Sequence, residues 1–225
     1  MTTETKKHGI LLINKPKSVT SFSLIPILRK LTNVQTIGHA GTLDPFATGV
    51  MVYLVGKEYT KTSNIYLNAE KHYMAVIYLG IQTDTFDIDG QVISENAMQP
   101  TYDDVLKMIA KQQGIKEQIP PMFSAKKYQG RPLYHLARKG ITVERKPQIV
   151  KLKTTLISYN YPYIKLYIEC SKGTYVRTIA DEIGQDLTCG AHLFELTRTQ
   201  CGPFTLKDCD SFEDIKQNVF QYMRK

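Results

Sequence analysis

The chain has 225 residues, 42% of them hydrophobic, which is enough to bury a core without a cofactor or cross-link. No apolar run is long enough to cross a bilayer, and the apolar residues 10–13 are too few for a signal peptide. The four cysteines form no CxxC pair, which fits a cytoplasmic protein. The formal net charge is +8, and residues 120–180 carry 12 Lys and Arg against two acidic residues. This local excess favours a nucleic-acid partner over a merely solvated basic surface.

The N-terminal part predicts a short buried strand and then an amphipathic helix. Residues 9–13 are apolar and end at Lys15-Pro16, and Thr20 or Ser21 can cap the helix that follows. The inward positions of this helix are Phe22, Ile25, Leu28 and Leu31.

A glycine-rich segment follows at residues 38–49, with three Gly and one Pro in twelve residues. This composition predicts a loop of defined shape, and the apolar run 50–55 after it predicts a buried strand. Within the loop, Asp44 precedes Pro45, a pair that usually marks a turn. A carboxylate in a loop held by buried strands, with His39 five positions before it, is also a candidate catalytic group.

The remaining chain mixes strands and helices. Thr101 is expected to cap a helix whose first turn holds Asp103 and Asp104. The predicted strands are residues 73–79, 149–158, 163–170 and 193–199, with 149–158 and 163–170 forming a hairpin. The other predicted helices are residues 132–140, about 174–187 and about 210–223. The whole predicts an α+β fold in a single domain, 1–225, with a mixed, mostly antiparallel sheet flanked by helices and a basic insertion at about 122–147.

Metal and nucleotide motifs are missing from the sequence. Residues 49–57 have the wrong spacing for a P-loop, residues 84–96 lack the ligands of a calcium loop, and the five His form no ligand pattern. We therefore expect no metal site.

The glycine-rich segment Gly38–Gly49 closely resembles the signature of the TruB family of tRNA pseudouridine synthases. Further motifs follow in the family's order: Asn14-Lys15-Pro16 with Val19-Thr20-Ser21, Lys71-His72-Tyr73, Leu79-Gly80 to Gly90, Ile119-Pro120-Pro121 to Gly130, and Cys170 to Arg177 with Gly190 to Leu193. The resemblance implies the pseudouridine synthase fold and isomerisation of uridine to pseudouridine at position 55 in the T-loop of tRNA, without a metal or organic cofactor. The tRNA T-loop and stem are the expected partner. We expect a monomer without an obligate protein partner and, because the matched region ends near residue 200, a short form without the C-terminal PUA domain.

The resemblance implies four central roles. Asp44 is the nucleophile, and it attacks either C6 of the uracil or C1′ of the ribose. Arg177 keeps this carboxylate ionised, although it can instead contact a phosphate. Asp87 holds Arg177 in place or only caps a turn. Tyr73 stacks on the target base and takes part in removing the C5 proton, or is a core aromatic residue.

The remaining expected site residues bind the substrate or support the loop. His39 stacks on or wedges beside displaced nucleotides, or is a structural histidine. Leu196 lines the uracil pocket or belongs to the core. Lys15 with Pro16 braces the active-site loop, a role favoured over contact with the substrate. The target base must be flipped out of the T-loop. Four residues of the insertion are expected to bind the T-loop from outside: Lys126, Lys127, Tyr128 and Arg131.

Two other functions fit parts of the pattern. A non-catalytic RNA-binding protein could keep the scaffold, but it would not need Asp44, Tyr73 and Arg177 together. A guide-RNA-dependent pseudouridine synthase subunit resembles this core, but such proteins use the C-terminal module for assembly. The sequence therefore favours the stand-alone enzyme.

Overall fold

The computed structural model describes residues 7–225, which form two compact units. One unit contains the residues up to Tyr73 together with Leu196–Lys225, and the other contains Met74–Glu195. The chain passes from the first unit to the second within strand β4 (Lys71–Leu79) and returns within strand β12 (Ala191–Cys201).

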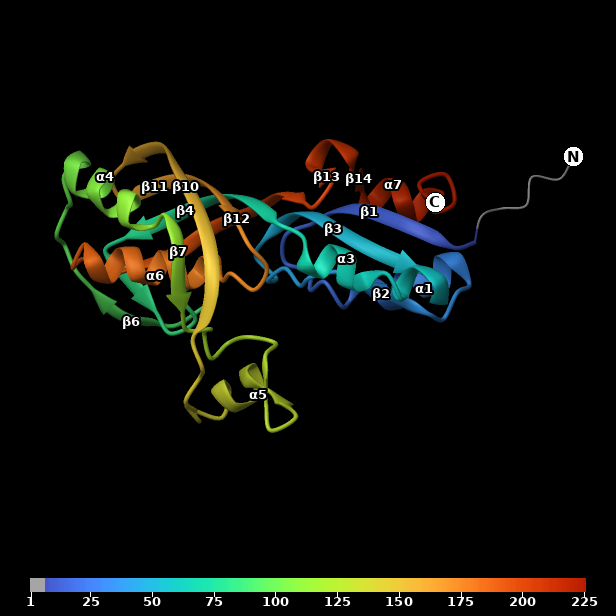
Figure 1. Cartoon of the computed structure of the whole chain (residues 1–225), viewed down its shortest axis with the longest axis horizontal. Coiled ribbons are helices and arrows are strands. Elements are labelled where there is room, and N and C mark those ends of the chain that lie inside the picture. The colour runs from blue at the N-terminus through green and yellow to red at the C-terminus, as the bar shows by residue number, and fades with distance from the viewer. Residues whose placement is uncertain (1–6) are drawn as a thin grey trace, which may run out of the picture. The chain divides into compact units, whose positions relative to one another are not determined.

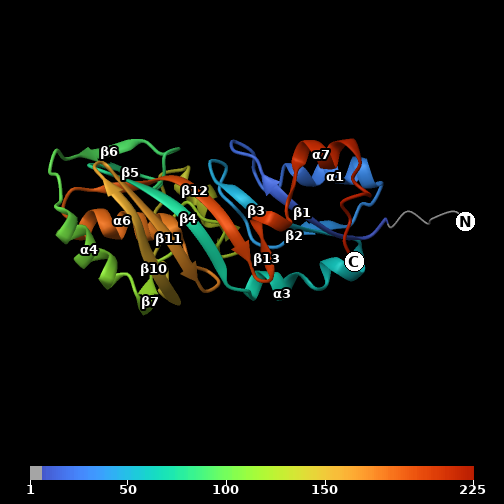
Figure 2. The ribbon, with the colours of Figure 1, turned by 90° about the horizontal axis from the view of Figure 1, so that it is seen from above.

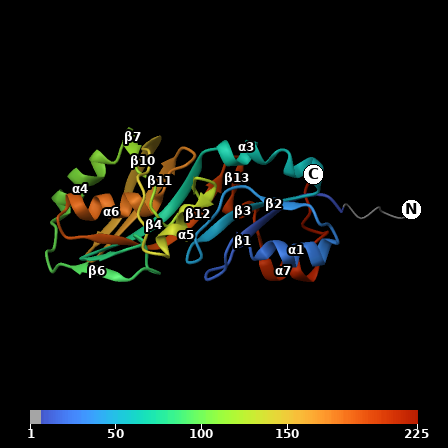
Figure 3. The ribbon, with the colours of Figure 1, turned by 90° about the horizontal axis from the view of Figure 1, so that it is seen from below.

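The first unit is built on the strands β1 (Gly9–Lys15) and β3 (Thr48–Val55). These strands pair antiparallel along their whole length, and nearly every residue in them is buried. Two parallel pairings flank them, β14 with β1 and β12 with β3. Helices α1 and α7 lie on one face of β1 and β3, and α3 lies on the opposite face (Figures 2 and 3). Cover on both faces explains why these strands are continuously apolar rather than alternating.

The other elements of the first unit are short. Its remaining strands are β2 (Ile37–His39), β13 (Phe204–Thr205) and β14 (Asp210–Ser211). Its helices are α1 (Leu24–Thr32), α2 (Lys57–Thr60), α3 (Ser63–Asn68), the 3₁₀ turn η1 (Leu206–Asp208) and α7 (Phe212–Gln217).

The second unit is a sheet with helices packed on it. Its strand order is β12, β4, β11, β10, β7, with both β11 and β7 antiparallel to β10, and helix α4 packs against β10 and α6 (Figure 1). Its strands are β5 (Ile81–Thr83), β6 (Val92–Glu95), β7 (Gly114–Gln118), β8 (Lys127–Tyr128), β9 (Arg131–Pro132), β10 (Gln148–Asn160) and β11 (Tyr163–Cys170). Its helices are α4 (Tyr102–Lys111), α5 (Leu133–Ala137) and α6 (Val176–Asp186).

The basic insertion is a small substructure of the second unit. The chain leaves the sheet after β7, forms β8, β9 and α5, and returns in β10; Figure 1 shows this segment extending away from the strands. The β8–β9 hairpin turns at Gln129 and Gly130, both in the left-handed region (φ 47° and 81°). Lys127 and Tyr128 therefore lie directly before a tight two-residue turn.

The predicted α+β fold with a mixed, mostly antiparallel sheet is confirmed. The expected long strands and the hairpin of β10 and β11 are present, and Thr101 caps α4 in a reciprocal capping box with Asp104. Three expectations were wrong in detail. Helix α1 begins at Leu24, so Phe22 lies outside it and is 65% exposed. Helix α7 is only six residues long. The ends of the glycine-rich segment belong to β2 and β3, which leaves residues 40–47 as the loop.

None of the helices within residues 7–225 is long and apolar enough to span a membrane.

Candidate active site

Asp44 lies in a loop of the first unit that is anchored by its apolar neighbours. Leu43, Phe46 and Ala47 are buried, whereas the side chain of Asp44 is half-buried. The backbone N–H of Ala47 donates to the carbonyl of Asp44, which closes a turn around the acid. The neighbours of Asp44 thus fix the loop in the core, while Asp44 itself keeps part of its surface exposed.

Lys15 contacts the backbone of this loop. Its side chain is completely buried, and its ammonium group donates to the carbonyls of Pro16 (2.8 Å), Val19 (2.6 Å) and Pro45 (3.1 Å). Since an ammonium group has three donors, all of them are used on backbone. One of the three acceptors directly follows Asp44, so Lys15 ties the end of β1 to the loop.

Ser21 holds the residue on the other side of Asp44. Its hydroxyl accepts from the N–H of Leu43 (2.9 Å) and donates to the carbonyl of the same residue (3.1 Å). Tyr53 in β3 fixes Ser21 in turn, because its hydroxyl donates to the Ser21 carbonyl (2.8 Å). The sequence suggests a helix cap at Ser21, but in the structure its hydroxyl serves the Asp44 loop.

The electrostatics of the loop are set by buried cations. The pKa of Lys15 is lowered to about 8, chiefly by burial and to a smaller extent by the charge of Arg198, against the attraction of the Asp44 carboxylate. Burial and, secondarily, Arg198 also lower the pKa of His39. Among residues 7–225 the buried Nδ1 atom of His39 has no hydrogen-bond partner, and its ring meets Tyr53 edge-on with centroids 6.1 Å apart. A neutral His39 ring is therefore favoured at pH 7.

Tyr73 lies on the buried side of β4 near its start, 8% exposed. Two positions earlier, the ammonium group of Lys71 donates to the carbonyls of Tyr66 (2.9 Å), Leu67 (2.7 Å) and Ala69 (2.6 Å) at the end of α3. Lys71 therefore anchors the beginning of the strand that carries Tyr73.

Leu196 lies in β12 and is also buried, 6% exposed. Such burial is compatible with a pocket lining and with an ordinary core position, so the two readings of Leu196 stay open.

Arg177 and Asp87 come together in the second unit. Arg177 is at the start of α6, and its Nε atom lies 3.5 Å from Oδ2 of Asp87, with both side chains more than nine-tenths buried. The guanidinium also donates to the carbonyls of Thr85 (3.2 Å) and Phe123 (2.8 Å). Several fixed acceptors hold a planar guanidinium in one orientation.

Asp87 also closes its own turn. Its Oδ1 accepts from the Thr85 hydroxyl (2.6 Å) and from the Asp89 N–H (3.1 Å), while Oδ2 faces Arg177. Both expected readings of Asp87 therefore have a structural counterpart, one on each carboxylate oxygen.

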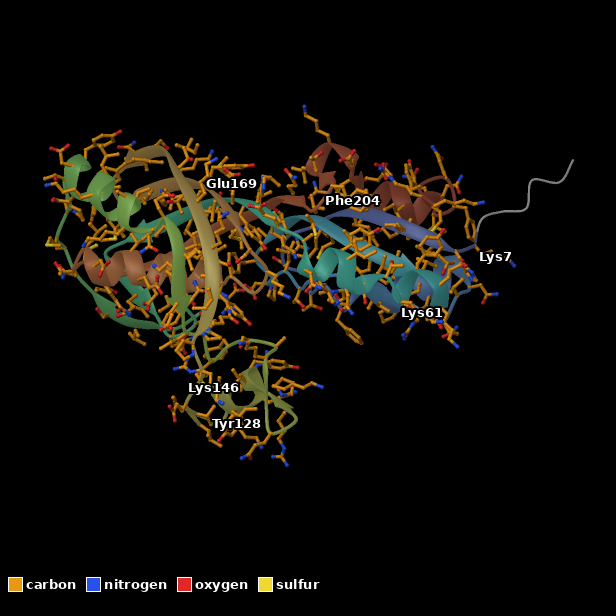
Figure 4. All side chains as sticks on the ribbon, viewed as in Figure 1. Lys7, Lys61, Tyr128, Lys146, Glu169 and Phe204 are labelled. Carbon is orange, nitrogen blue, oxygen red and sulfur yellow. The ribbon has the colours of Figure 1, made fainter. Side chains whose placement is uncertain are left out.

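The expected tRNA-gripping residues lie on the insertion of the second unit. Lys126, Lys127, Tyr128 and Arg131 are all exposed, and Figure 4 shows Tyr128 and Lys146 on the segment that extends from the sheet. The root of this segment is fixed by Arg145, whose Nη1 donates to the carbonyl of Pro120 (3.1 Å). The charges are thus presented to solvent on a segment attached at both ends.

Arg198 in β12 was missed by the sequence analysis. It is 1% exposed, and its Nε donates to the Val50 carbonyl (2.7 Å) just after the Asp44 loop. The available signal was a charged residue two positions after Leu196 in a strand expected to be buried. Its contact with Val50 depends on the pairing of β12 with β3, which sequence patterns do not give.

Two family models cover most of the chain. The model described as TruB family pseudouridylate synthase (N terminal domain) matches residues 29–176. The model described as tRNA pseudouridylate synthase B C-terminal domain matches residues 177–225.

Curated relatives and solved structures agree with these matches. The chain is 57% identical over 202 residues to tRNA pseudouridine synthase B of Protochlamydia amoebophila (strain UWE25), covering 90% of this chain and 77% of that protein. It is 50% identical over 203 residues to tRNA pseudouridine synthase B of Chlamydia abortus (strain DSM 27085 / S26/3), a match that covers 90% of this chain and 86% of that protein. A crystal structure of a Cbf5–Nop10–Gar1 complex matches with a TM-score of 0.75 at 23% identity, over 96% of this chain and 56% of that chain. This last likeness concerns the fold.

The fold and these matches define a pseudouridine synthase, an isomerase that acts on uridine in RNA. The chain belongs to the TruB family of pseudouridylate synthases.

Proposed function

We propose that this protein isomerises uridine to pseudouridine at position 55 in the T-loop of tRNA, as a stand-alone enzyme with Asp44 as nucleophile. The relatives named tRNA pseudouridine synthase B, at 57% and 50% identity, support tRNA as the substrate. The observation that carries the choice of Asp44 is its half-buried carboxylate on a loop braced on both sides, by Ser21 and Lys15. A nucleophile must be held in position before its substrate binds, and the contacts of Ser21 and Lys15 hold the backbone on both sides of Asp44.

The reaction moves one bond and leaves the composition unchanged. The bond from N1 of the uracil to C1′ breaks, the ring turns, and a bond from C5 to C1′ forms while C5 loses its proton and N1 gains one. Asp44 forms a transient bond either to C6 or to C1′, which keeps one fragment attached in the meantime. Tyr73 stacks on the ring and takes part in removing the C5 proton.

Arg177 and Asp87 are proposed to maintain the charge that the nucleophile needs. A carboxylate in a dry pocket is disfavoured unless a cation opposes the loss of solvation. Arg177 is the proposed cation, and Asp87 is the proposed partner that fixes its orientation, supported by their 3.5 Å ion pair.

Access to the target requires the base to leave its stack. Unstacking costs a few kcal/mol, which binding of the rest of the tRNA offsets. His39 is proposed to wedge beside the displaced nucleotides, and Leu196 to line the uracil pocket. The exposed Lys126, Lys127, Tyr128 and Arg131 are proposed to hold the T-loop from outside.

The decisive test is tritium release from [5-³H]uridine-labelled tRNA transcript, because isomerisation expels the C5 proton. We expect release with the wild type, no release with Asp44→Asn, and tRNA affinity within about twofold for both. A transcript with cytidine in place of the T-loop uridine is the substrate control. Tight binding without release by the wild type would favour the RNA-binding reading, and equal release from the control transcript would place the modified uridine elsewhere.

A further inference from the structure

Arg198 is a buried cation whose guanidinium donates to the loop that carries Asp44 and to the strand that follows it. Its Nε donates to the carbonyl of Val50 (2.7 Å), and its Nη2 donates to the carbonyl of Gly41 (3.3 Å) and to the sulfur of Met51 (2.8 Å). None of these three acceptors is a carboxylate. Burying a charge is costly unless it is both hydrogen-bonded and paired with an opposite charge, so a buried guanidinium held by backbone carbonyls and a sulfur points to a structural or functional role.

These contacts connect the two ends of the Asp44 loop. Gly41 precedes the acid by three residues and Val50 follows it by six. Because the guanidinium is a rigid planar fork, one side chain fixes the separation of the two carbonyls. Ser21 and Lys15 hold Leu43 and Pro45 within the loop, whereas Arg198 holds its ends.

Two glycines face Arg198, Gly41 near the start of the loop and Gly49 in β3 just after its end. Gly49 pairs with Arg198 in the β3–β12 ladder, and a Cβ on Gly49 would lie 2.2 Å from the Arg198 carbonyl oxygen. A Cβ on Gly41 would lie 3.5 Å from Nη1 of Arg198. Both glycines have positive φ, 107° and 84°. The close backbone approach at Gly49 is what brings the arginine under the loop.

The charge of Arg198 also acts on two titratable groups beside the loop, Lys15 at the end of β1 and His39 at the end of β2. It contributes to lowering the pKa of Lys15, after burial, and does the same at His39. The underside of the loop therefore carries two buried cations, Lys15 and Arg198.

We propose that Arg198 is a positioning residue for the nucleophile: by bridging the Gly41 and Val50 carbonyls it sets the shape of the loop that carries Asp44. This inference rests on the proposed role of Asp44. It assigns to Arg198 an effect on the rate of the chemical step and none on tRNA affinity.

The test compares Arg198→Lys with Cys201→Ala, a control for lost packing: Cys201 is buried on the same strand and in the same core cluster as Ala40 and Val50, but its thiol donates to the Tyr66 carbonyl and does not bridge the loop. Lysine keeps the charge but cannot bridge two carbonyls as a fork does. We expect Arg198→Lys to lower the single-turnover rate at saturating tRNA by about 10- to 100-fold with tRNA Kd within twofold. Cys201→Ala should leave both within twofold. A folded Arg198→Lys variant with an unchanged rate, or one whose defect lies in Kd, would overturn the proposal.

Two measurements do not depend on the chemistry of Asp44. Hydrogen exchange of residues 40–47 should be faster in Arg198→Lys than in Cys201→Ala, and equal exchange would overturn the positioning role. If Arg198→Lys does not fold, NMR of the wild type can measure how fast the Arg198 Nε–H exchanges with solvent. Slow exchange supports the bridge between the Gly41 and Val50 carbonyls, and fast exchange refutes it. Should Asp44→Asn retain activity, the proposed function fails, while the exchange data still report on the loop.

Discussion

At the scale of single residues, Lys15 combines complete burial with three backbone acceptors. Lys15→Met keeps the length and apolar stem but leaves buried carbonyls without a donor. We expect it to lower the free energy of unfolding by about 2 kcal/mol at pH 7 and to reduce turnover, because the Pro45 carbonyl next to Asp44 is released. Urea unfolding and the tritium assay measure the two effects. Lys17→Met, at an exposed lysine, is the matched control and should change stability by less than about 0.5 kcal/mol.

Because the pKa of Lys15 is lowered, the difference in stability between the wild type and Lys15→Met should depend on pH. Between about pH 8 and 10.5 the unfolded chain holds the lysine proton more firmly than the folded chain does. The stability of the wild type relative to Lys15→Met should therefore rise with pH across this window, by up to about 3 kcal/mol. A difference that is flat in pH would show that Lys15 titrates normally in the folded protein.

Asp87 allows its two roles to be separated. Asp87→Asn keeps an oxygen for Thr85 and Asp89 but removes the charge that faces Arg177. If the ion pair serves catalysis, turnover should fall by about tenfold or more while the melting temperature changes by only a few degrees. Asp89→Asn, at an exposed position of the same turn, provides the control. Lost stability with unimpaired turnover would leave turn capping as the role of Asp87.

At the scale of elements, the pairing of β3 with β12 makes Gly49 intolerant of a side chain. Gly49→Ala combines positive φ with a Cβ placed 2.2 Å from the Arg198 carbonyl oxygen, whereas Gly130 has positive φ and open space around it. We expect Gly130→Ala to cost about 1–2 kcal/mol and Gly49→Ala at least twice that, measured by urea unfolding. Equal costs would mean that backbone conformation alone, and not the strand approach, requires glycine at 49.

The helices and strands that were predicted correctly are those whose own residues show a clear pattern of hydrophobicity, turns or capping. The apolar run of β3, the hairpin of β10 and β11, and the capped helix α4 were all predicted. Helices α2 and α3, with four and six residues, are too short to show amphipathic periodicity. Strand β7 reads as polar, and its place comes from pairing with β10.

The same limit applies to the candidate site. The motif around Asp44 was visible because its residues are neighbours in the chain. Ser21 and Arg198 act on that loop from 22 and 157 residues away in sequence. Their roles depend on tertiary contacts for which no local pattern exists.

At the scale of the whole molecule, the exposed lysines and arginines of the basic insertion predict that binding of RNA depends on salt concentration. Replacing Lys126 and Lys127 by Gln should weaken tRNA binding and reduce the slope of log K against log salt by about 1–2, because up to two phosphate contacts are lost. Binding titrations at several salt concentrations measure this slope. The matched control replaces two exposed lysines of the first unit, Lys57 and Lys61, and should leave the slope unchanged. An unaltered slope in the first variant would remove the insertion from the RNA interface.

The ammonium groups of Lys15 and Lys71 each donate to three carbonyls, so chemical labelling of these two lysines can report on the opening of the first unit. An amine-directed acylating reagent needs a free, deprotonated nitrogen, and both nitrogens are enclosed in the folded chain. Exposed Lys17 and Lys61 should acquire label within minutes while Lys15 and Lys71 stay unlabelled. The fraction of molecules labelled at the enclosed pair, counted by mass spectrometry, then measures how often the first unit opens.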